Sequence, residues 1–433
     1  MAEYLILGAG LTGLSTAYHL EQNKIFDYSI FEKESRPGGL LKTHNYKGFL
    51  FDYTGHLIHI SDNYFKNFLE QVCGLKNFTL SQRNSSIYSN GVFTLYPFQM
   101  NLYGLPIEII CECIEGYILR DKKIKTPKSF YQWVCKYFGY GLGKYFFFTY
   151  NSKLFDYSVK KITPSWIGRF VPSTTFKDII KGAITQNISD TGYNSSFYYP
   201  KSGGIEFLIS CIVEKITGQI KTLHTVSAID LKNKIVIFKN GHQEKYKKLV
   251  STIPLRDFLS LIINETSTNL SNTSKYLKCT SVVNFNLGFN KEEISPYHWI
   301  YFPEKKYPFY RLGFWNNISS LLVPDNTGAL YGEYSYRADT KNLKTINKNV
   351  SKSIEQVLYL FGLKEKNIIV KKNLDINCAY VIYDQWRERN IKKILNILAQ
   401  HSVYSIGRYG AWKYASMQEA VLDGYDVVKR LIK

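Results

Sequence analysis

The sequence lacks any apolar run long enough to cross a lipid bilayer, although 45% of its 433 residues are hydrophobic. A membrane-spanning helix needs about 20 predominantly apolar residues. The first predicted strand also begins within four residues of Met1, which leaves no room for a cleavable leader. These absences predict a globular protein with no membrane span, located in the cytoplasm.

The patterns of metalloproteins and hydrolases are missing as well. The seven cysteines show no zinc-like spacing, since one residue separates Cys111 from Cys113 and no histidine lies nearby. We expect reduced thiols and no metal site. The sequence has no Gly-x-Ser-x-Gly elbow and no convincing carboxylate pair, so neither a serine hydrolase nor a glycosidase is supported.

Acidic residues are scarce, with 35 against 55 basic ones, and the formal net charge is +20. Such an excess suggests an anionic partner, for example a nucleotide, a nucleic acid or a membrane surface. The lysines, however, occur in scattered pairs such as Lys122-Lys123 and Lys371-Lys372, and Lys, Asn, Ile and Tyr are abundant throughout. A solvated basic surface is therefore favoured, and we expect no nucleic-acid partner.

Three glycines follow a short apolar strand at residues 5–7 and precede a helical pattern: Gly8, Gly10 and Gly13. The first glycine permits a tight turn, the second lets the backbone approach a pyrophosphate, and the third lets the helix pack on the strand. The N–H groups that begin the helix then face the phosphates. Glu32 ends a second strand at the distance expected for an acceptor of a ribose hydroxyl. The sequence therefore predicts a dinucleotide site.

A second glycine-rich turn, Arg36-Pro37-Gly38-Gly39-Leu40, follows directly. It can pass over the pyrophosphate, and plain NAD dehydrogenases do not usually carry it. We therefore interpret the dinucleotide as FAD. The alternative is that these glycines serve only as structural turns.

The length exceeds that of a single hydrophobic core, so two or three domains are expected. A helix at residues 205–216, a hairpin around Asn240-Gly241 and a closing strand and helix that end at residue 432 suggest a return to the first sheet. We predict an α/β fold with a Rossmann-like FAD-binding domain (1–60, 196–256 and 396–433). Aromatic-rich helical patterns predict a helical domain at 100–195, and alternating runs predict an antiparallel sheet substrate domain at 61–99 and 257–395.

These elements, in this order, resemble the flavoproteins that include amine oxidases, protoporphyrinogen oxidases and UDP-galactopyranose mutases. Residues 48–56 resemble the flavin-facing loop of the mutases, and residues 407–414 resemble their C-terminal flavin and substrate motif. Residues 96–101 and 150–155 resemble uridine-binding segments of the eukaryotic-type mutases. The segments 166–169 and 299–311 resemble the places from which that family presents arginines to the substrate diphosphate.

The resemblance implies a role for each matched residue. His56, acting through its backbone beside the flavin, and the diphosphate-binding Arg169 and Arg311 are the expected catalytic residues. The expected substrate contacts are Tyr96, Gln99, Asn151, Phe155, Asn194, Trp299, Tyr301, Tyr380 and Tyr414. The expected FAD contacts are Gly8, Gly10, Thr12, Gly13, Glu32, Arg36, Gly39, Leu40, Gly55, Val226, Gly407, Arg408 and Met417.

Residue chemistry is compatible with these roles and with purely structural ones. Arginine suits bidentate phosphate binding. Asn151 and Asn194 could bind a base or sugar edge or form Asx turns, and among 35 tyrosines many are ordinary core. The chain also departs from the mutases: Phe155 replaces a tryptophan, and Ile318 lies where a substrate-side tyrosine is expected.

The implied activity is interconversion of UDP-galactopyranose and UDP-galactofuranose, or of a related nucleotide sugar, for cell-surface glycans. In that family the N5 of reduced FAD forms a covalent adduct with the sugar, and NAD(P)H is a possible reductant. Two alternatives stay open: an FAD-dependent oxidase or dehydrogenase of the amine oxidase or protoporphyrinogen oxidase type, and a catalytically silent nucleotide-binding scaffold. The sequence does not indicate the oligomeric state.

Overall fold

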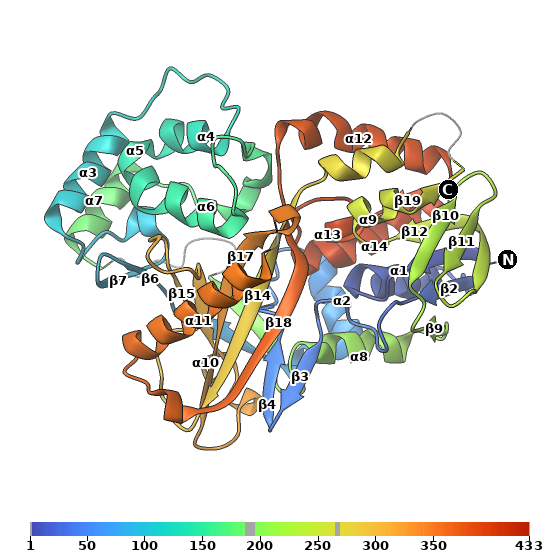
Figure 1. Ribbon diagram of the computed structural model, residues 1–433, viewed down its shortest axis with the longest axis horizontal. Coiled ribbons are helices and arrows are strands. Elements are labelled where there is room, and N and C mark those ends of the chain that lie inside the picture. Colours follow the sequence, from blue (N-terminus) through green and yellow to red (C-terminus); the bar gives the residue numbers. More distant parts are fainter. Residues whose placement is uncertain (1, 187–194, 265–268, 341, 433) are drawn as a thin grey trace.

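A computed structural model describes residues 2–186, 195–264, 269–340 and 342–432. Figure 1 shows a helical lobe formed by α3 to α7 at the upper left, a large sheet around β14, β17 and β18 in the middle, and a second sheet beside both termini at the right. No helix in these ranges is long and apolar enough to cross a membrane. The expected mixed α/β architecture is confirmed.

The eight-stranded sheet carries the first glycine turn and runs in the order β13-β10-β11-β12-β1-β2-β9, with β19 beside β12. Strand β1 is parallel to both β2 and β12, and its residues Tyr4 to Leu7 are buried, as expected for a strand covered on both faces. The strands are β1 (Ala2–Leu7), β2 (Tyr28–Phe31), β9 (Ile220–Lys221), β10 (Val226–Asp230), β11 (Ile235–Phe238), β12 (Gln243–Ser251), β13 (Ile262–Ile263) and β19 (Val403–Ser405).

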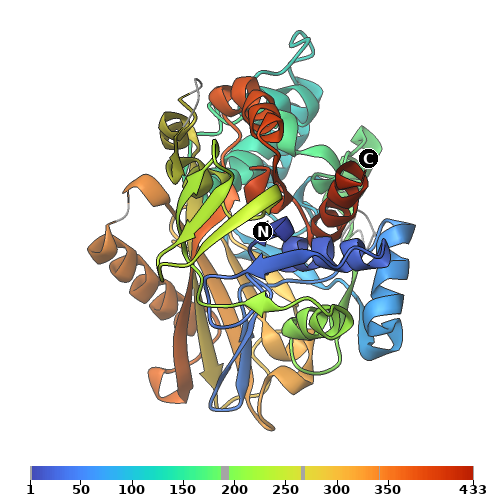
Figure 2. The same ribbon diagram turned by 90° about the vertical axis from the view of Figure 1, so that its right-hand side faces the viewer.

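The two ends of the chain complete this unit together. Helix α1 (Leu11–Gln22) packs against α14 (Met417–Leu431), and the Ser15 hydroxyl donates to the Val421 carbonyl at 2.8 Å. Figure 2 shows the two terminal helices side by side. The expected closing strand and helix are therefore confirmed, as are the β11–β12 hairpin and the helix α8 (Glu206–Lys215).

The second sheet has seven strands in the order β18-β14-β17-β16-β15-β6-β7. Strand β14 is buried along its whole length between the antiparallel β17 and β18. Buried Ile346, Val350 and Ile354 of α11 (Leu343–Leu360) share a hydrophobic cluster with this sheet. The strands are β6 (Ser85–Ser89), β7 (Val92–Leu95), β14 (Cys279–Phe289), β15 (Trp299–Tyr301), β16 (Arg311–Phe314), β17 (Gly328–Arg337) and β18 (Ile368–Val381).

The helical lobe lies within the expected range of residues 100–195. Helices α3 and α5 pack so closely that a Cβ on Gly141 would collide with the Glu112 carbonyl oxygen. Glycine is required there because the backbones touch. The helices are α3 (Ile107–Ile118), α4 (Phe130–Tyr137), α5 (Gly139–Leu142), α6 (Phe148–Phe155) and α7 (Phe176–Ile184), with a π-helical turn between α5 and α6.

Strand pairing departs from the expected domain boundaries at three places. The two-residue β13 joins the first sheet beyond residue 256, and α12 (Gln385–Gln400) packs on β19 before residue 396. Strand β5 (Phe78–Gln82) pairs with β8 (Ser196–Pro200) outside the seven-stranded sheet. Strands as short as β13 carry no periodicity of their own, so tertiary pairing alone decides where they belong. The remaining elements are β3 (Thr43–Tyr46), β4 (Phe49–Asp52), α2 (Asn63–Cys73), α9 (Leu255–Ser260), α10 (Trp315–Ile318) and α13 (Gly407–Gly410).

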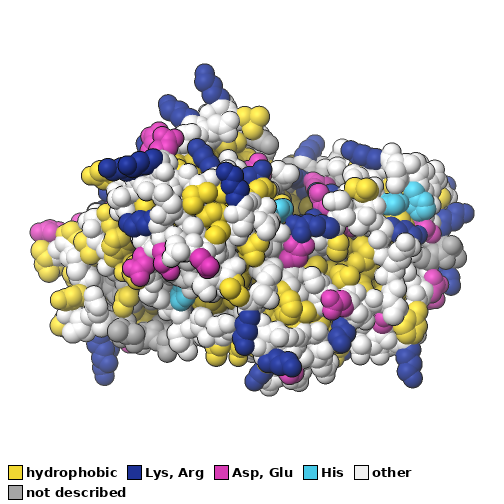
Figure 3. Space-filling view, turned by 90° about the horizontal axis from the view of Figure 1, so that it is seen from below, with side chains coloured by type: hydrophobic (Ala, Val, Ile, Leu, Met, Phe, Trp, Pro, Cys, Tyr) yellow, Lys and Arg dark blue, Asp and Glu magenta, His cyan; other side chains and the backbone are white. Residues whose placement is uncertain are grey.

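Basic side chains are scattered over one face of the molecule. On the face drawn in Figure 3, lysines and arginines alternate with apolar and acidic side chains and do not gather in one stripe. This distribution agrees with the expected solvated basic surface.

Candidate functional site

The first glycine turn has the geometry of a dinucleotide site. Gly8 has a φ of +97°, and its N–H donates to the Phe31 carbonyl at 2.8 Å. A Cβ on Gly13 would collide with the Gly8 carbonyl oxygen, so α1 can begin directly beneath the turn only with glycine at this position. No side chain caps the N-terminus of α1, which leaves its first N–H groups for an anionic ligand.

The second glycine turn lies directly on the first. The Gly38 N–H donates to the Ala9 carbonyl at 2.9 Å, and a Cβ on Gly39 would approach Gly10 Cα to 3.3 Å. A Cβ on Gly10 would meet no atom closer than Gly39 Cα, at 3.8 Å. The two turns therefore face each other through backbone alone. This is the bare surface that close approach of a pyrophosphate requires, so the residues present fit FAD.

Glu32 and Gly407 complete the part of the candidate site around the β1–α1 turn, where the dinucleotide is expected. Buried Glu32 accepts the Ala9 N–H at 2.8 Å and the Glu34 N–H at 3.0 Å, which fixes its carboxylate at the end of β2. Gly407 begins α13, and a Cβ there would lie 2.8 Å from Thr12 Oγ1. The C-terminal motif thus closes over the start of α1, next to Met417 at the start of α14.

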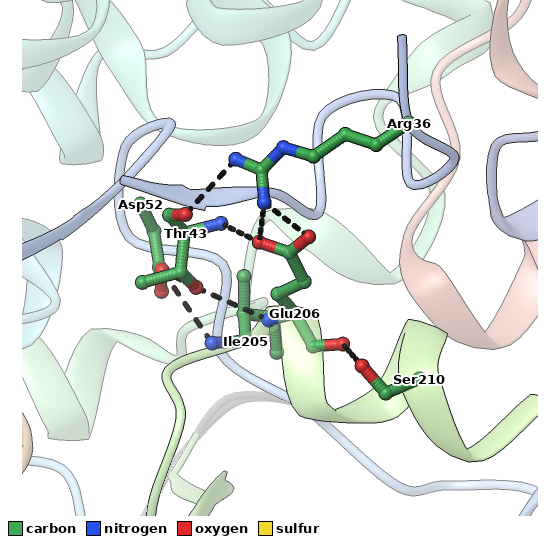
Figure 4. A network of polar contacts seen from close by, with 6 residues as sticks. All are labelled: Arg36, Thr43, Asp52, Ile205, Glu206 and Ser210. Carbon is green, nitrogen blue, oxygen red and sulfur yellow. Dashed lines mark hydrogen bonds and ion pairs between the residues drawn. The ribbon is translucent and has the colours of Figure 1, made fainter. Parts of the chain in front are cut away.

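Arg36 is engaged within the protein. Its guanidinium forms an ion pair with Glu206 and donates to the Thr43 carbonyl at 3.0 Å (Figure 4). The Thr43 hydroxyl donates to Asp52 at 2.6 Å, and Asp52 also accepts the Tyr199 hydroxyl at 2.6 Å. Arg36 therefore holds the β3–β4 hairpin against α8, and its expected contact with FAD stays a prediction. Leu40, which follows the second glycine turn, and Val226, which begins β10, are half-buried, and their contacts with FAD stay predictions too.

His56 lies in the loop after β4, where Gly55 is needed because a Cβ would collide with the Tyr331 hydroxyl. The buried His56 Nδ1 hydrogen-bonds to no residue in the described part of the chain. Burial and the nearby positive charges of Arg408 and Arg311 lower the pKa of His56 to about 4. The imidazole is therefore neutral at pH 7 and has a nitrogen free for a ligand.

Arg311 and Glu333 form an ion pair on adjacent strands, in which Glu333 is fully buried and the Arg311 side chain is 20% exposed. Arg311 Nε and Nη2 donate to Glu333 Oε1 at 2.8 and 2.6 Å, and the Tyr310 hydroxyl also donates to this carboxylate. Burial alone would lower the pKa of Arg311, but Glu333 raises it well above its ordinary value. Arg311 Nη1 donates to no residue among those described, so one edge of the guanidinium remains for a ligand.

Aromatic rings extend from Arg311 in two directions. The Tyr96 and Tyr150 rings lie 5.1 and 5.5 Å from that of Tyr301. On the other side the Tyr380 ring stacks 6.2 Å from Tyr414 and lies 6.1 Å from Phe155. The structure thus brings together the predicted Tyr96, Phe155, Tyr301, Tyr380 and Tyr414.

Arg408 faces this aromatic cluster. Its guanidinium lies 4.7 Å from the Tyr414 ring centre and donates to the carbonyls of Ala415 and Ala379 at 2.7 and 2.8 Å. The two carbonyls fix the side chain close enough to His56 to lower the pKa of that histidine. The expected contact of Arg408 with FAD stays a prediction.

The remaining predicted contacts fall into three groups. Buried Gln99 donates to the Pro172 carbonyl and Asn151 to the Phe147 carbonyl, each at 2.9 Å, so these amide nitrogens are used within the protein. The buried Trp299 Nε1 has no hydrogen-bond partner within the described ranges. Asn194 and the side chain of Arg169 lie outside what the structure describes. The roles of all five stay predictions.

Sequence reasoning missed Glu333, Tyr331 and Lys153. A carboxylate within the otherwise apolar run 330–334 was the available signal for Glu333. Lys153 gave none: its Nζ donates to the carbonyls of Phe302, Phe309 and Glu304 at 2.6, 2.6 and 3.0 Å, and burial lowers its pKa to about 7. It ties α6 to the turn that precedes Arg311.

A cavity lies apart from this site. It has a volume of about 660 Å³, belongs to the helical lobe and is lined by Glu112, Arg120, Tyr131 and Tyr140, among others. In the described part of the chain, no group of three or more His, Cys, Asp or Glu side chains could hold a metal ion.

Comparison with known proteins agrees with this geometry. The family model of flavin containing amine oxidoreductases matches residues 11–295. A solved structure of reduced UDP-galactopyranose mutase superposes with a TM-score of 0.93 at 23% identity, covering 100% of this chain and 94% of that one. A protein from Exiguobacterium sp. 255-15 described as a protoporphyrinogen oxidase gives a TM-score of 0.75 at 14% identity, covering 99% and 98%. These two likenesses show the fold.

A curated relative matches over a shorter stretch. Coproporphyrinogen III oxidase of Staphylococcus aureus (strain NCTC 8325 / PS 47) is 30% identical over 106 residues, which are 24% of this chain and 22% of that protein. The matched stretch is therefore about a fifth of the relative's length.

Proposed function

The chain belongs to the flavin containing amine oxidoreductase family, and on this premise we propose that it is an FAD-dependent isomerase that interconverts the pyranose and furanose forms of a UDP-linked sugar. UDP-galactose is the first candidate substrate. The likeness to the fold of a UDP-galactopyranose mutase supports this choice within the family.

The observation that carries the proposal is the Arg311–Glu333 pair inside the aromatic cluster. Glu333 holds two of the three guanidinium nitrogens at 2.8 and 2.6 Å, which fixes the plane of the group and leaves Nη1 as a donor. A fixed, permanently charged donor suits an anionic diphosphate better than a neutral amine. Arg408, whose partners are carbonyls and rings, supplies further positive charge that no carboxylate of the described residues neutralises.

The rings around this pair suit a nucleotide sugar. Phe155 and Tyr380 offer faces for a uracil, and the hydroxyls of Tyr301, Tyr380 and Tyr414 offer donors to phosphate or sugar. Phe155 has less area than the tryptophan of the mutases, so stacking on the base is weaker. Arg169 is the second diphosphate ligand in this proposal.

Bound in its reduced form, FAD supplies a nucleophilic N5 for the anomeric carbon and is not consumed over a turnover. The chain's own task is to hold that carbon near the flavin and to retain UDP while its charge develops. His56 is neutral at pH 7, so we assign it a positioning role beside the flavin. NAD(P)H is the reductant that we propose.

The decisive experiment is turnover with and without reduction. The purified protein is reduced anaerobically with dithionite, mixed with UDP-galactopyranose, and the products are separated by chromatography. We expect the furanose only from reduced protein. Steady oxygen consumption with an amine or a porphyrinogen would favour the oxidase alternative, and UDP binding without any product would favour a silent scaffold.

A further inference from the structure

Lys42, just beyond the second glycine turn, is almost completely buried. Only 7% of the residue is exposed, whereas lysines are almost never buried unless they are paired. Within the described ranges, no residue forms a hydrogen bond or a close ion pair with its ammonium group. A buried charge is costly unless it is paired and hydrogen-bonded. This ammonium therefore suits an anionic partner from outside the chain.

The stem of Lys42 packs against the bare backbone of the turn. A Cβ on Gly38 would lie 3.0 Å from Lys42 Cγ, and the ammonium nitrogen follows three bonds further along the side chain. The Gly38 N–H donates to the Ala9 carbonyl at 2.9 Å, and the Ala9 N–H donates to Glu32 at 2.8 Å. The lysine thus belongs to the set of contacts that joins the two glycine turns and Glu32.

The surroundings of Lys42 balance its charge only in part. Burial disfavours the charged form and lowers the pKa of Lys42. The carboxylates of Glu32, Glu34 and Glu206 act in the opposite direction, and Arg36 adds to the effect of burial. Because the pKa stays below its ordinary value, these carboxylates do not offset burial in full. The charge on Lys42 therefore lowers the stability of the fold unless a further anion binds.

The other basic side chains considered for this region have partners. Arg36 forms its ion pair with Glu206 (Figure 4). Arg408 donates to two carbonyls, and the exposed Lys33 lies 3.6 Å from an acidic neighbour. A pyrophosphate brings two negative charges to the glycine turns, and the N-terminus of α1 offers only partial positive charge. Among these basic side chains, Lys42 is the one without a partner in the described part of the chain.

We propose that the ammonium group of Lys42 binds the pyrophosphate of FAD and balances its charge at the glycine turns. The inference rests on the FAD interpretation and is independent of the sugar nucleotide. A phosphate oxygen supplies the charge-assisted hydrogen bond that the chain itself does not provide. Lys42 therefore destabilises the flavin-free protein and stabilises the holoenzyme.

FAD affinity tests the contact. Lys42→Met keeps an unbranched stem against the turn but removes the charge, and Lys33→Met is the matched control because it removes an exposed charge from the same segment. Flavin-free proteins are prepared from the holoenzymes and titrated with FAD, and the quenching of flavin fluorescence gives the Kd. We expect Lys42→Met to bind FAD about ten- to a hundredfold more weakly and Lys33→Met to change the Kd less than about twofold. Unchanged FAD affinity in Lys42→Met would overturn the proposal.

Urea unfolding of the flavin-free proteins separates a ligand contact from a structural role. We expect Lys42→Met to unfold at the same or a higher urea concentration than the unaltered chain, because it removes an incompletely balanced buried charge. The same substitution thus weakens FAD binding without weakening the flavin-free fold. A lower midpoint would show that the lysine serves the fold itself and would refute the proposal.

Two further variants distinguish a phosphate from a ribose hydroxyl as the partner. Lys42→Arg keeps the charge and should recover part of the FAD affinity, whereas Lys42→Gln keeps a hydrogen-bond donor without charge and should not. Recovery by Lys42→Gln would overturn the assignment to the pyrophosphate. Absence of FAD binding in the unaltered chain would overturn this proposal together with the FAD interpretation. Absence of furanose product from the FAD-loaded protein would refute the proposed isomerase alone, and the FAD affinities would still decide the role of Lys42.

Discussion

At Arg311, the proposed binding of the diphosphate and the stability of the fold depend on the same contacts. The guanidinium is held by Glu333, which is fully buried, so removal of either partner strands a charge in the interior. Breaking a buried ion pair typically costs about 3–5 kcal/mol. An alanine at this position therefore tests folding and function together, and a second change is needed to separate them.

We predict that Arg311→Ala loses about 3–5 kcal/mol of unfolding free energy as well as turnover, and that Arg311→Ala with Glu333→Gln recovers most of the stability but none of the turnover. A lost charge-assisted contact to the diphosphate lowers turnover by about one to two orders of magnitude. Arg311→Lys should recover turnover only in part, since it keeps the charge but loses the planar fork. Urea unfolding and product chromatography measure the two effects. Normal turnover in the double variant would show that Arg311 does not contact substrate.

Lys153 provides a second prediction for single residues. Its three carbonyl partners fix the turn before Arg311, although Lys153 was not itself predicted to contact FAD or the substrate. Lys153→Met leaves these carbonyls unpaired, so we expect a loss of about 2–4 kcal/mol of stability together with a rise in the KM for the nucleotide sugar. Lys153→Arg, which keeps the charge, should lose less. Unchanged KM in a folded Lys153→Met protein would limit Lys153 to a structural role.

His19 determines a pH dependence that does not involve the site. It is buried in α1, and its Nδ1 lies 2.6 Å from the Ser15 carbonyl and its Nε2 2.7 Å from the Tyr64 hydroxyl. Burial lowers its pKa to about 4 from an ordinary value of 6.5. Between these values the unfolded chain binds a proton that the folded chain does not, so stability falls as the pH falls from about 6.5 toward 4.

We therefore expect His19 to account for a loss of about 2 kcal/mol between pH 7 and pH 5. The amide of His19→Gln can still donate and accept hydrogen bonds. The free energy of unfolding of this variant should change less over this pH range than that of the unaltered chain. Urea titrations at the two pH values compare them. An equal change in unfolding free energy between the two pH values for both proteins would mean that His19 is charged in the folded protein or accessible to solvent.

At the scale of elements, the nucleotide site depends on contact between backbones. The β1–α1 turn, the Gly38-Gly39 turn and the start of α13 meet at positions where a Cβ has little or no room. The sequence pattern shows the glycines, and the structure shows which backbone each one faces.

We predict that Gly13→Ala yields mostly flavin-free protein, because its Cβ would collide with the Gly8 carbonyl and push α1 away from the turn. Gly362→Ala is the control for an added Cβ that meets nothing: no atom lies within 4 Å of it, although its φ of +60° strains the backbone, whereas Gly13 is helical. It should cost about 1 kcal/mol and keep its flavin. The ratio of flavin to protein absorbance measures both variants. Full flavin content in Gly13→Ala would place the dinucleotide elsewhere.

At the scale of the whole molecule, the FAD site is assembled from distant parts of the chain. Gly8 and Gly407 contribute to the same nucleotide end, and Gly55 meets Tyr331 of the second sheet. A ligand that binds only the folded state stabilises it in proportion to the logarithm of its concentration over Kd.

We accordingly expect FAD at 100 times its Kd to stabilise the protein by about 2.7 kcal/mol, with a corresponding rise in Tm. Differential scanning calorimetry of the flavin-free protein with increasing FAD measures the shift, and NAD serves as the control dinucleotide. A larger shift with NAD than with FAD would contradict the interpretation of the second glycine turn.

Local chemistry in the sequence was sufficient for the dinucleotide turn and the helical lobe. Glycines at fixed spacing after a strand allow few conformations, and such features depend on neighbours along the chain, which is why they could be recognised before any fold was known. The segments 96–101, 299–311 and 407–414 were identified by their resemblance to a known family, and the roles of their residues stay predictions.

Only the tertiary structure decided the partners that lie far apart in sequence. It paired Arg311 with Glu333, placed Arg408 against Tyr414 and the Ala379 carbonyl, and assigned Arg36 to Glu206. It also joined β13 to the first sheet. Such choices depend on strand register and on packing between domains, and neither leaves a periodic trace in the sequence. The sequence by itself thus determined which chemical groups are present, and the fold determined which of them face one another.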